Sequence, residues 1–146
     1  MENDVVNRKL ESLRRCVERI QSKLPVTPDA LRANYDLQDI IALNLQRAVQ
    51  LCVDIAAYVI SRTTMPAPNT MAESFARLLD LQILSPQLAE RMQKAVAFRN
   101  ILVHNYTDIN WDIVVNIVTY HLTDFVQFAQ AITRLDDDNG QRQNQP

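Results

Sequence analysis

A single glycine in 146 residues, Gly140, limits what this chain can fold into more than any other feature of the sequence. Tight β-hairpin turns, phosphate-binding loops and dinucleotide-binding folds all depend on glycine, because they need positive φ angles or a close approach of the backbone. This chain almost entirely lacks the residue that those structures require. Together with its 47% of apolar residues, this favours an all-α protein with a buried helical core.

Length and charge predict one helical domain followed by a polar tail. Residues 1–134 are long enough for a single domain and leave no room for a second. Residues 135–146 contain three aspartates and several amides but little apolar side chain, so we expect this acidic tail to be disordered. The three aspartates and Arg142 account for the whole net charge of −2. The domain itself is therefore neutral, and any RNA recognition must be local, with few contacts.

The sequence also predicts a soluble, cytoplasmic protein. No run of eighteen apolar residues occurs, because the richest stretch, residues 43–60, is interrupted by polar and charged side chains. The N-terminus, which contains Glu2 and Asp4, does not resemble a signal peptide. Neither feature suggests a membrane-bound or secreted protein.

Apolar periodicity and proline breaks predict an antiparallel bundle of about five helices. The expected helices cover approximately residues 4–23, 35–62, 71–81, 86–104 and 111–134. The expected N-terminal caps are Thr70 with Glu73, Ser85 with Pro86, and Asn110 or Asp108. Surplus apolar side chains on the second and fifth of these helices suggest that the protein forms a homodimer.

Candidate catalytic residues interrupt the apolar pattern at the end of the fourth predicted helix. Arg99 is a permanent cation suited to a phosphate, His104 can exchange a proton near neutral pH, and Tyr106 offers a hydroxyl. Each also has a structural interpretation, since an arginine can serve the helix dipole and a histidine or tyrosine can simply pack. Five residues separate Arg99 from His104, about 140° around an ideal helix. We expect the two side chains to converge on one phosphate, within the chain or across a dimer.

Other polar residues are weaker candidates. Asn44, Arg47, Gln50 and Asp54 mark one side of the second predicted helix, where they could line a cleft, form exposed surface or contact another subunit. The first helix carries mixed charges on one face, which usually means a solvated surface, although a nucleic-acid contact is the alternative. These charges are Arg8, Lys9, Arg14, Arg15 and Arg19 with Glu2, Glu11 and Glu18.

Three further residues are expected to be structural. Cys16 and Cys52 lie among apolar helical positions without other ligands at metal-binding spacing, so we expect reduced core thiols and no metal site. His121 lies next to apolar positions and is expected to be packed.

The stretch from Arg99 to Tyr106 reads R-N-x-L-V-H-x-Y and is followed by one more long helix. This pattern resembles the HepT-like branch of the HEPN superfamily, whose signature is an arginine, a neighbouring polar residue and a histidine, with a tyrosine two residues later. Arg99, Asn100, His104 and Tyr106 match it. The resemblance extends over nearly the whole chain except the tail.

The resemblance implies a metal-independent endoribonuclease toxin of a toxin–antitoxin system. It implies catalytic roles for Arg99, Asn100 and His104, and no cofactor for cleavage. It also implies a MntA-like nucleotidyltransferase antitoxin, with which the toxin forms a homodimer or higher hetero-oligomer, and which uses ATP to transfer AMP to Tyr106. The alternative from the same superfamily is a non-catalytic, substrate-binding partner subunit of a minimal nucleotidyltransferase.

Overall fold

The computed structural model describes residues 4–143, with side chains described as far as Leu135, and this part of the chain is entirely helical. The elements are α1 (Asp4–Gln21), α2 (Pro28–Arg32), α3 (Tyr35–Ser61), α4 (Met71–Asp80), α5 (Pro86–His104), the 3₁₀ turn η1 (Tyr106–Asp108), α6 (Trp111–Tyr120) and α7 (Leu122–Gln143). The predicted all-α bundle is therefore confirmed.

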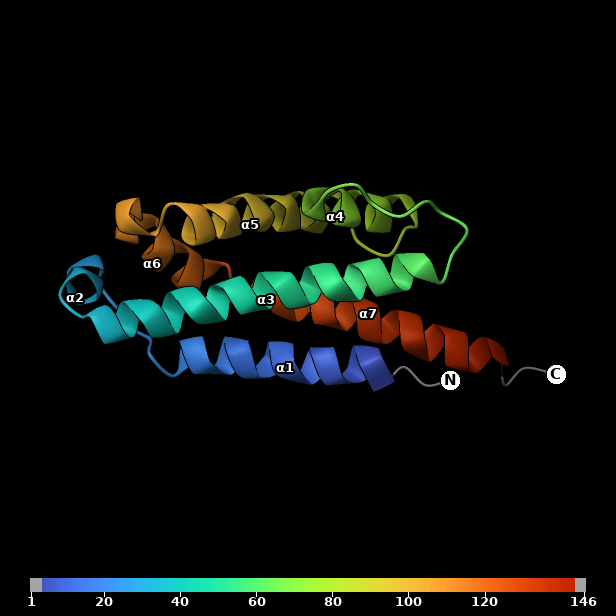
Figure 1. Ribbon diagram of the computed structural model, residues 1–146. Helices are drawn as coiled ribbons and strands as arrows, with labels where there is room; N and C mark the ends of the chain where they lie inside the picture. The colour runs from blue at the N-terminus through green and yellow to red at the C-terminus, as the bar shows by residue number, and fades with distance from the viewer. Residues whose placement is uncertain (1–3, 144–146) are drawn as a thin grey trace.

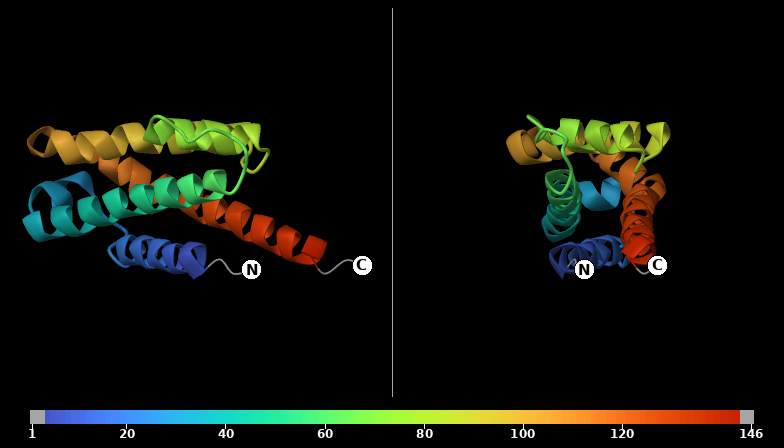
Figure 2. Two further views of the ribbon diagram at one scale, coloured as in Figure 1. Left: turned by 45° about the vertical axis from the view of Figure 1, so that its right-hand side comes forward. Right: turned by 90° about the vertical axis from the view of Figure 1, so that its right-hand side faces the viewer.

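Helix α3 is the centre of the bundle. It packs against α1, α4 and α5 and also contacts α2 and α7. Seen along the bundle, α3 and α7 lie opposite each other, with α1 on one side and the α4–α5 pair on the other (Figures 1 and 2). The buried core lies between these helices. In it, the rings of Phe75 and Phe128 pack edge to face with centroids 5.8 Å apart.

Helix α3 is also the one helix in the described residues that is long and apolar enough to cross a membrane by length and composition. Its most apolar window has a mean hydropathy of 1.4, and 56% of that window is buried within the fold. Its central place among its neighbours accounts for this composition, because a helix packed on several sides needs apolar residues around much of its surface.

The structure differs from the sequence-based expectation in three helices. The connection before residue 35 contains the short helix α2, which Thr27 caps and which buries Leu31 completely. The fifth predicted helix is divided into α6 and α7 at His121, whose backbone N–H donates to the carbonyl of Ile117 and closes the last turn of α6. Helix α7 continues to Gln143, beyond the predicted end at residue 134, because extending a formed helix adds one backbone hydrogen bond for each residue fixed. Residues 144–146 of the predicted tail lie outside the described residues.

Local signals placed the helix starts correctly. The side chains of Thr70, Ser85 and Asn110 accept hydrogen bonds from the first backbone N–H groups of α4, α5 and α6, as predicted. The reciprocal bond of the capping box is shifted by one residue, because the Glu73 carboxylate accepts from the N–H of Asn69 and not from that of Thr70. Both cysteines are free and buried, and burial raises the pKa of each thiol.

Candidate active site at the end of α5

Arg99 is fixed against α3 by hydrogen bonds. Its guanidinium donates to the Oε1 atom of Gln50 at 3.3 Å and to the Oδ1 atom of Asn100 at 3.2 Å. Gln50 is itself oriented, because its Nε2 group donates to Asp54 at 2.9 Å, which leaves the amide oxygen free to face the arginine. The Nε atom of Arg99 is buried, with no partner among the described residues. Each terminal nitrogen of Arg99 makes one hydrogen bond to a described residue and carries a second N–H, so these nitrogens retain donors for an anionic ligand.

Tyr106 is held near the N-terminal end of α3, whereas Gln50 lies near the middle of this helix. Its hydroxyl donates a hydrogen bond of 2.6 Å to the carboxylate of Asp39, and its ring meets Trp111 edge to face with centroids 6.3 Å apart. Partial burial, the hydrogen bond to Asp39 and the charge of that carboxylate raise the pKa of Tyr106 to about 12. The hydroxyl is thus protonated at neutral pH, and the side chain is 37% exposed.

His104 is the last residue of α5 and lies between these two anchored side chains in the sequence. Its side chain is exposed, and it makes no hydrogen bond or ion pair with any side chain that the structure describes. No hydrogen bond joins it to Arg99 among the described residues, so the convergence of the two on one phosphate stays a prediction. An exposed imidazole at a helix end is open to a ligand from solvent.

Sequence reasoning found one of the two α3 residues that hold the motif. Gln50 is one of the candidates that the sequence suggests for lining a cleft, and it does line a groove between α1 and α3. Asp39 is not among those candidates. Both belong to one strip of α3, comprising Asp39, Leu43, Arg47, Gln50 and Asp54. Their spacing of three or four residues places them on one helix face, and this periodicity was the available signal.

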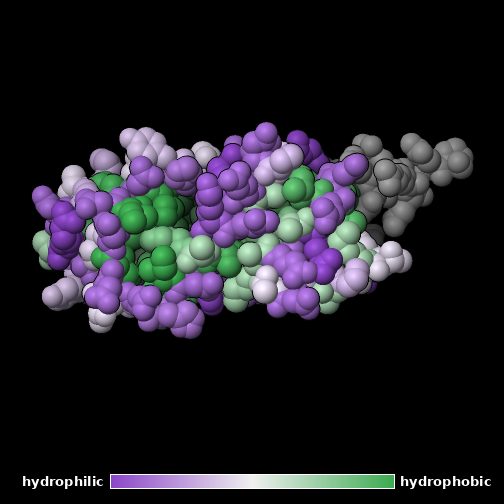
Figure 3. Space-filling view, turned by 90° about the horizontal axis from the view of Figure 1, so that it is seen from above, coloured by the Kyte–Doolittle hydropathy of each residue, from purple (hydrophilic) through white to green (hydrophobic). Residues whose placement is uncertain are grey.

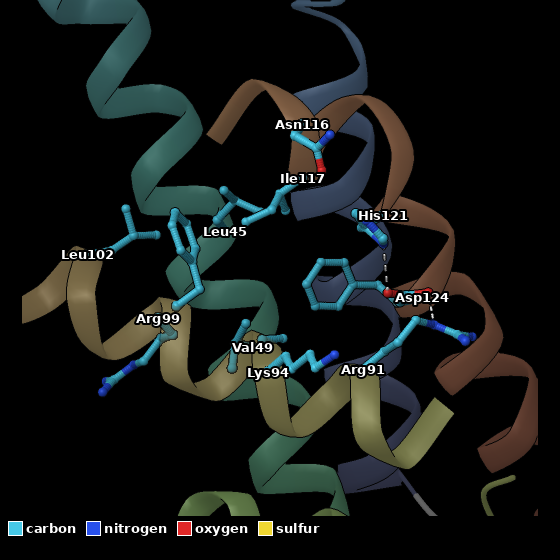
Figure 4. Close-up of a pocket in the computed structure, with 13 residues that line it drawn as sticks. Leu45, Val49, Arg91, Lys94, Arg99, Leu102, Asn116, Ile117, His121 and Asp124 are labelled. Carbon is cyan, nitrogen blue, oxygen red and sulfur yellow. Dashed lines mark hydrogen bonds and ion pairs between the residues drawn. The ribbon is translucent and has the colours of Figure 1, made fainter. Parts of the chain in front are cut away.

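An apolar pocket of about 370 Å³ lies between α3, α5, α6 and α7. Apolar side chains also gather around a hollow on the face drawn in Figure 3. Arg99 contributes to the pocket wall, but its guanidinium points away from the interior, and neither His104 nor Tyr106 lines the pocket (Figure 4). The pocket is therefore separate from the histidine and the tyrosine of the motif.

His121 lies at the rim of this pocket, and the prediction that it is packed was wrong. Its side chain is 47% exposed, and its Nδ1 atom lies 3.5 Å from Asp124, which also accepts a hydrogen bond from Arg91 at 2.8 Å. In the part of the chain that the structure describes, no three His, Cys, Asp or Glu residues are grouped to hold a metal ion.

The sequence matches the model of the family described as Ribonuclease HepT-like over residues 13–132. The chain belongs to the HepT-like ribonuclease family. This membership identifies the chain as an endoribonuclease and confirms the resemblance that the motif predicted. The matched range includes α3, α5 and the whole R-N-x-L-V-H-x-Y motif of this HepT-like chain.

Two HepT proteins are similar to this chain over most of their length. The chain is 35% identical to an mRNA nuclease HepT from Shewanella oneidensis over 130 residues, which cover 89% of this chain and 97% of that protein. It is 26% identical to a tRNA nuclease HepT from Aphanizomenon flos-aquae, covering 88% and 87%. A solved structure of a tri-AMPylated Shewanella oneidensis HEPN toxin in complex with an MNT antitoxin superposes with a TM-score of 0.85 and 34% identity, covering 91% of this chain and 99% of that one.

Proposed function

We propose that this HepT-like endoribonuclease is the toxin of a toxin–antitoxin pair and that it cleaves RNA with Arg99, Asn100 and His104. The observation that carries the proposal is the end of α5, where Gln50 and Asn100 hold the guanidinium of Arg99 while His104 stays exposed. The named activities of the two relatives, an mRNA nuclease and a tRNA nuclease, support RNA as the substrate.

The chemistry follows from the groups at this end of the helix. RNA carries its own nucleophile in the 2′-hydroxyl, which attacks the adjacent phosphorus while the bond to the 5′-oxygen of the next nucleotide breaks. His104 transfers a proton in this step, and Arg99 binds the phosphate and stabilises the charge that develops on it. Asn100 orients the guanidinium, to which its amide oxygen is hydrogen-bonded. The products are a 2′,3′-cyclic phosphate and a 5′-hydroxyl end, and the second proton is transferred by water or by the same histidine of a second copy.

Tyr106 is the proposed site of AMP transfer by a MntA-like nucleotidyltransferase. The tyrosine oxygen attacks the α-phosphorus of ATP, and the bond to pyrophosphate breaks. An AMP group there removes the proton that Asp39 accepts, so the tyrosine leaves this carboxylate and its added bulk and negative charge can block the phosphate site at Arg99. The AMPylated toxin in complex with its antitoxin, found in a structure with 34% identity, supports this assignment.

Three further expectations belong to the same proposal. The protein acts in the cytoplasm, its cleavage step needs no metal, and it forms a homodimer that associates with the antitoxin. The dimer is supported by apolar side chains left exposed beside the motif, namely Leu43 (44% exposed), Ile101 (44%) and Val103 (39%).

The test combines intact mass with an RNA cleavage assay, before and after incubation with ATP and the cognate nucleotidyltransferase. We expect cleavage by the wild type and not by His104→Ala, and an AMP-sized mass increase that maps to Tyr106 and stops cleavage. Tyr120→Phe, which alters another exposed tyrosine, is the matched control and should be modified normally. Absence of both cleavage and modification would support the non-catalytic partner subunit instead.

A further inference from the structure

A groove of about 490 Å³ runs between α1 and α3, and polar or charged residues make up most of its lining residues. Three arginines line it, Arg15 and Arg19 from α1 and Arg47 from α3. Asp54 is the one carboxylate among its lining residues, and Lys9 lies 3.6 Å from that carboxylate. The groove therefore carries a local excess of positive charge on a domain whose net charge is zero.

The three arginines Arg14, Arg15 and Arg19 of α1 differ in the ion pairs that they form. Arg14 is neutralised, because it forms ion pairs with both Glu11 and Glu18 and faces the side of α1 that packs towards α7. Arg15 lies 3.6 Å from Glu11, whereas Arg19 has no carboxylate within ion-pair distance among the side chains that the structure describes.

Arg47 likewise has no acidic partner within ion-pair distance in the described part of the chain. Its side chain is exposed, on the face of α3 that borders the groove. With Arg19, it gives the groove two guanidinium groups whose donors are available to an external anion.

The groove meets the candidate active site at Gln50. This residue lines the groove and also accepts the hydrogen bond from Arg99. Arg47 lies three positions before Gln50, so their side chains project from the same face of α3 with Cβ atoms about 5–6 Å apart. The three helices α1, α3 and α5 lie one above another on the side shown in Figure 1. A chain of phosphates bound at Arg99 would thus extend over Arg47 towards Arg19.

We infer that the groove between α1 and α3 binds the phosphate backbone of the RNA strand that is cleaved at Arg99. Unpaired guanidinium groups suit this ligand, since phosphate oxygens accept their hydrogen bonds in bidentate pairs. The inference rests on the proposed ribonuclease function and supplies the RNA contacts that the neutral charge of the domain leaves unexplained. It requires no contact with the bases, so the groove contributes affinity without sequence preference.

The test measures binding of single-stranded RNA of mixed sequence by fluorescence anisotropy at several salt concentrations, in the His104→Ala background so that RNA stays intact. Arg19→Gln and Arg47→Gln should each weaken binding by about 3- to 10-fold and reduce the slope of log affinity against log salt by about 0.7. Arg14→Gln is the matched control, and it should change affinity by less than about twofold because this cation is already neutralised.

Cleavage kinetics on proteins with His104 intact separate the outcomes. Arg19→Gln and Arg47→Gln should raise KM and leave kcat unchanged. If the wild type cleaves RNA but these variants match Arg14→Gln in affinity and salt slope, the inference is overturned while the proposed function stands. If RNA binding is unchanged and binding to the nucleotidyltransferase is lost, the groove is a protein interface and the inference is also overturned. The proposed function itself is wrong if the wild type shows no RNA cleavage that depends on His104.

Discussion

The two ends of the motif are held by α3, and its middle is not. Arg99 is bound by Gln50 and Tyr106 by Asp39, whereas His104 has no hydrogen bond to any side chain in the described part of the chain. Gln50 and Asp39 are eleven positions apart, roughly 16 Å along the helix axis. Helix α3 thus sets the positions of the proposed phosphate-binding group and of the proposed modification site and leaves the proposed proton-transfer group exposed.

This comparison also shows how modification of one end affects the other. Both anchoring bonds connect to a single rigid helix, so the arginine and the tyrosine keep fixed positions relative to each other. AMP transfer removes the proton that Asp39 accepts and places a phosphate beside that carboxylate, so the proposed block requires Tyr106 to leave Asp39 and bring the AMP group to Arg99.

Substitution of the unanchored histidine is expected to have the largest effect. His104→Ala should lower kcat for RNA cleavage by about 10²- to 10⁴-fold, because the proton-transfer group is lost. The side chain is exposed and holds nothing in the described chain, so the melting temperature should not change. His121→Ala, which alters the other histidine of the chain, should retain cleavage, and equal losses in both variants would disprove the assignment.

Replacing Arg99 should come next. Arg99→Gln should lower kcat by about 10²- to 10³-fold, since a charged donor to the transition state is removed. Arg99→Lys keeps the charge but lacks the planar pair of donors, so it should rescue only part of the activity. Single-turnover cleavage rates measure both variants. Full rescue by lysine would mean that only the charge matters and not the geometry held by Gln50.

Removing the anchor of Arg99 should cost less than removing Arg99 itself. Gln50→Ala leaves the guanidinium in place but frees its orientation, and we expect about a 3- to 10-fold loss of kcat/KM. Gln46→Ala, one turn earlier on α3, is the control and should have no effect beyond a small change in stability. Steady-state cleavage assays compare the two, and an unchanged rate in Gln50→Ala would show that the bond to α3 does not position the arginine.

The Asp39–Tyr106 contact should contribute stability with a particular pH dependence. Tyr106→Phe should lower the free energy of unfolding by about 1 kcal/mol at neutral pH, measured by urea denaturation. Because the folded-state pKa is raised to about 12 from the usual 10, this contribution is complete below pH 10 and is lost as the pH rises through 12. Ultraviolet titration of tyrosinate should show that Asp39→Asn lowers the pKa of Tyr106, whereas Asp36→Asn does not. A titration unaffected by Asp39→Asn would contradict the contact.

Much of the fold was predictable because its signals are local. The caps at Thr70, Ser85 and Asn110 bind N–H groups two or three residues away, so the chain sequence by itself brings their partners together. The division at His121 was not predictable, because the apolar pattern continues through it and neither glycine nor proline marks the end of α6.

The sequence by itself determined that this chain forms helices, where most of them begin, and which residues carry the HepT-like motif. The tertiary structure alone decided which residues hold the motif, because Asp39 lies 67 positions from Tyr106 and Gln50 lies 49 positions from Arg99. It also decided which arginines of α1 line a groove with α3. Such pairings depend on how each helix is rotated about its axis and on which helix lies beside it, and burial of the whole core sets both.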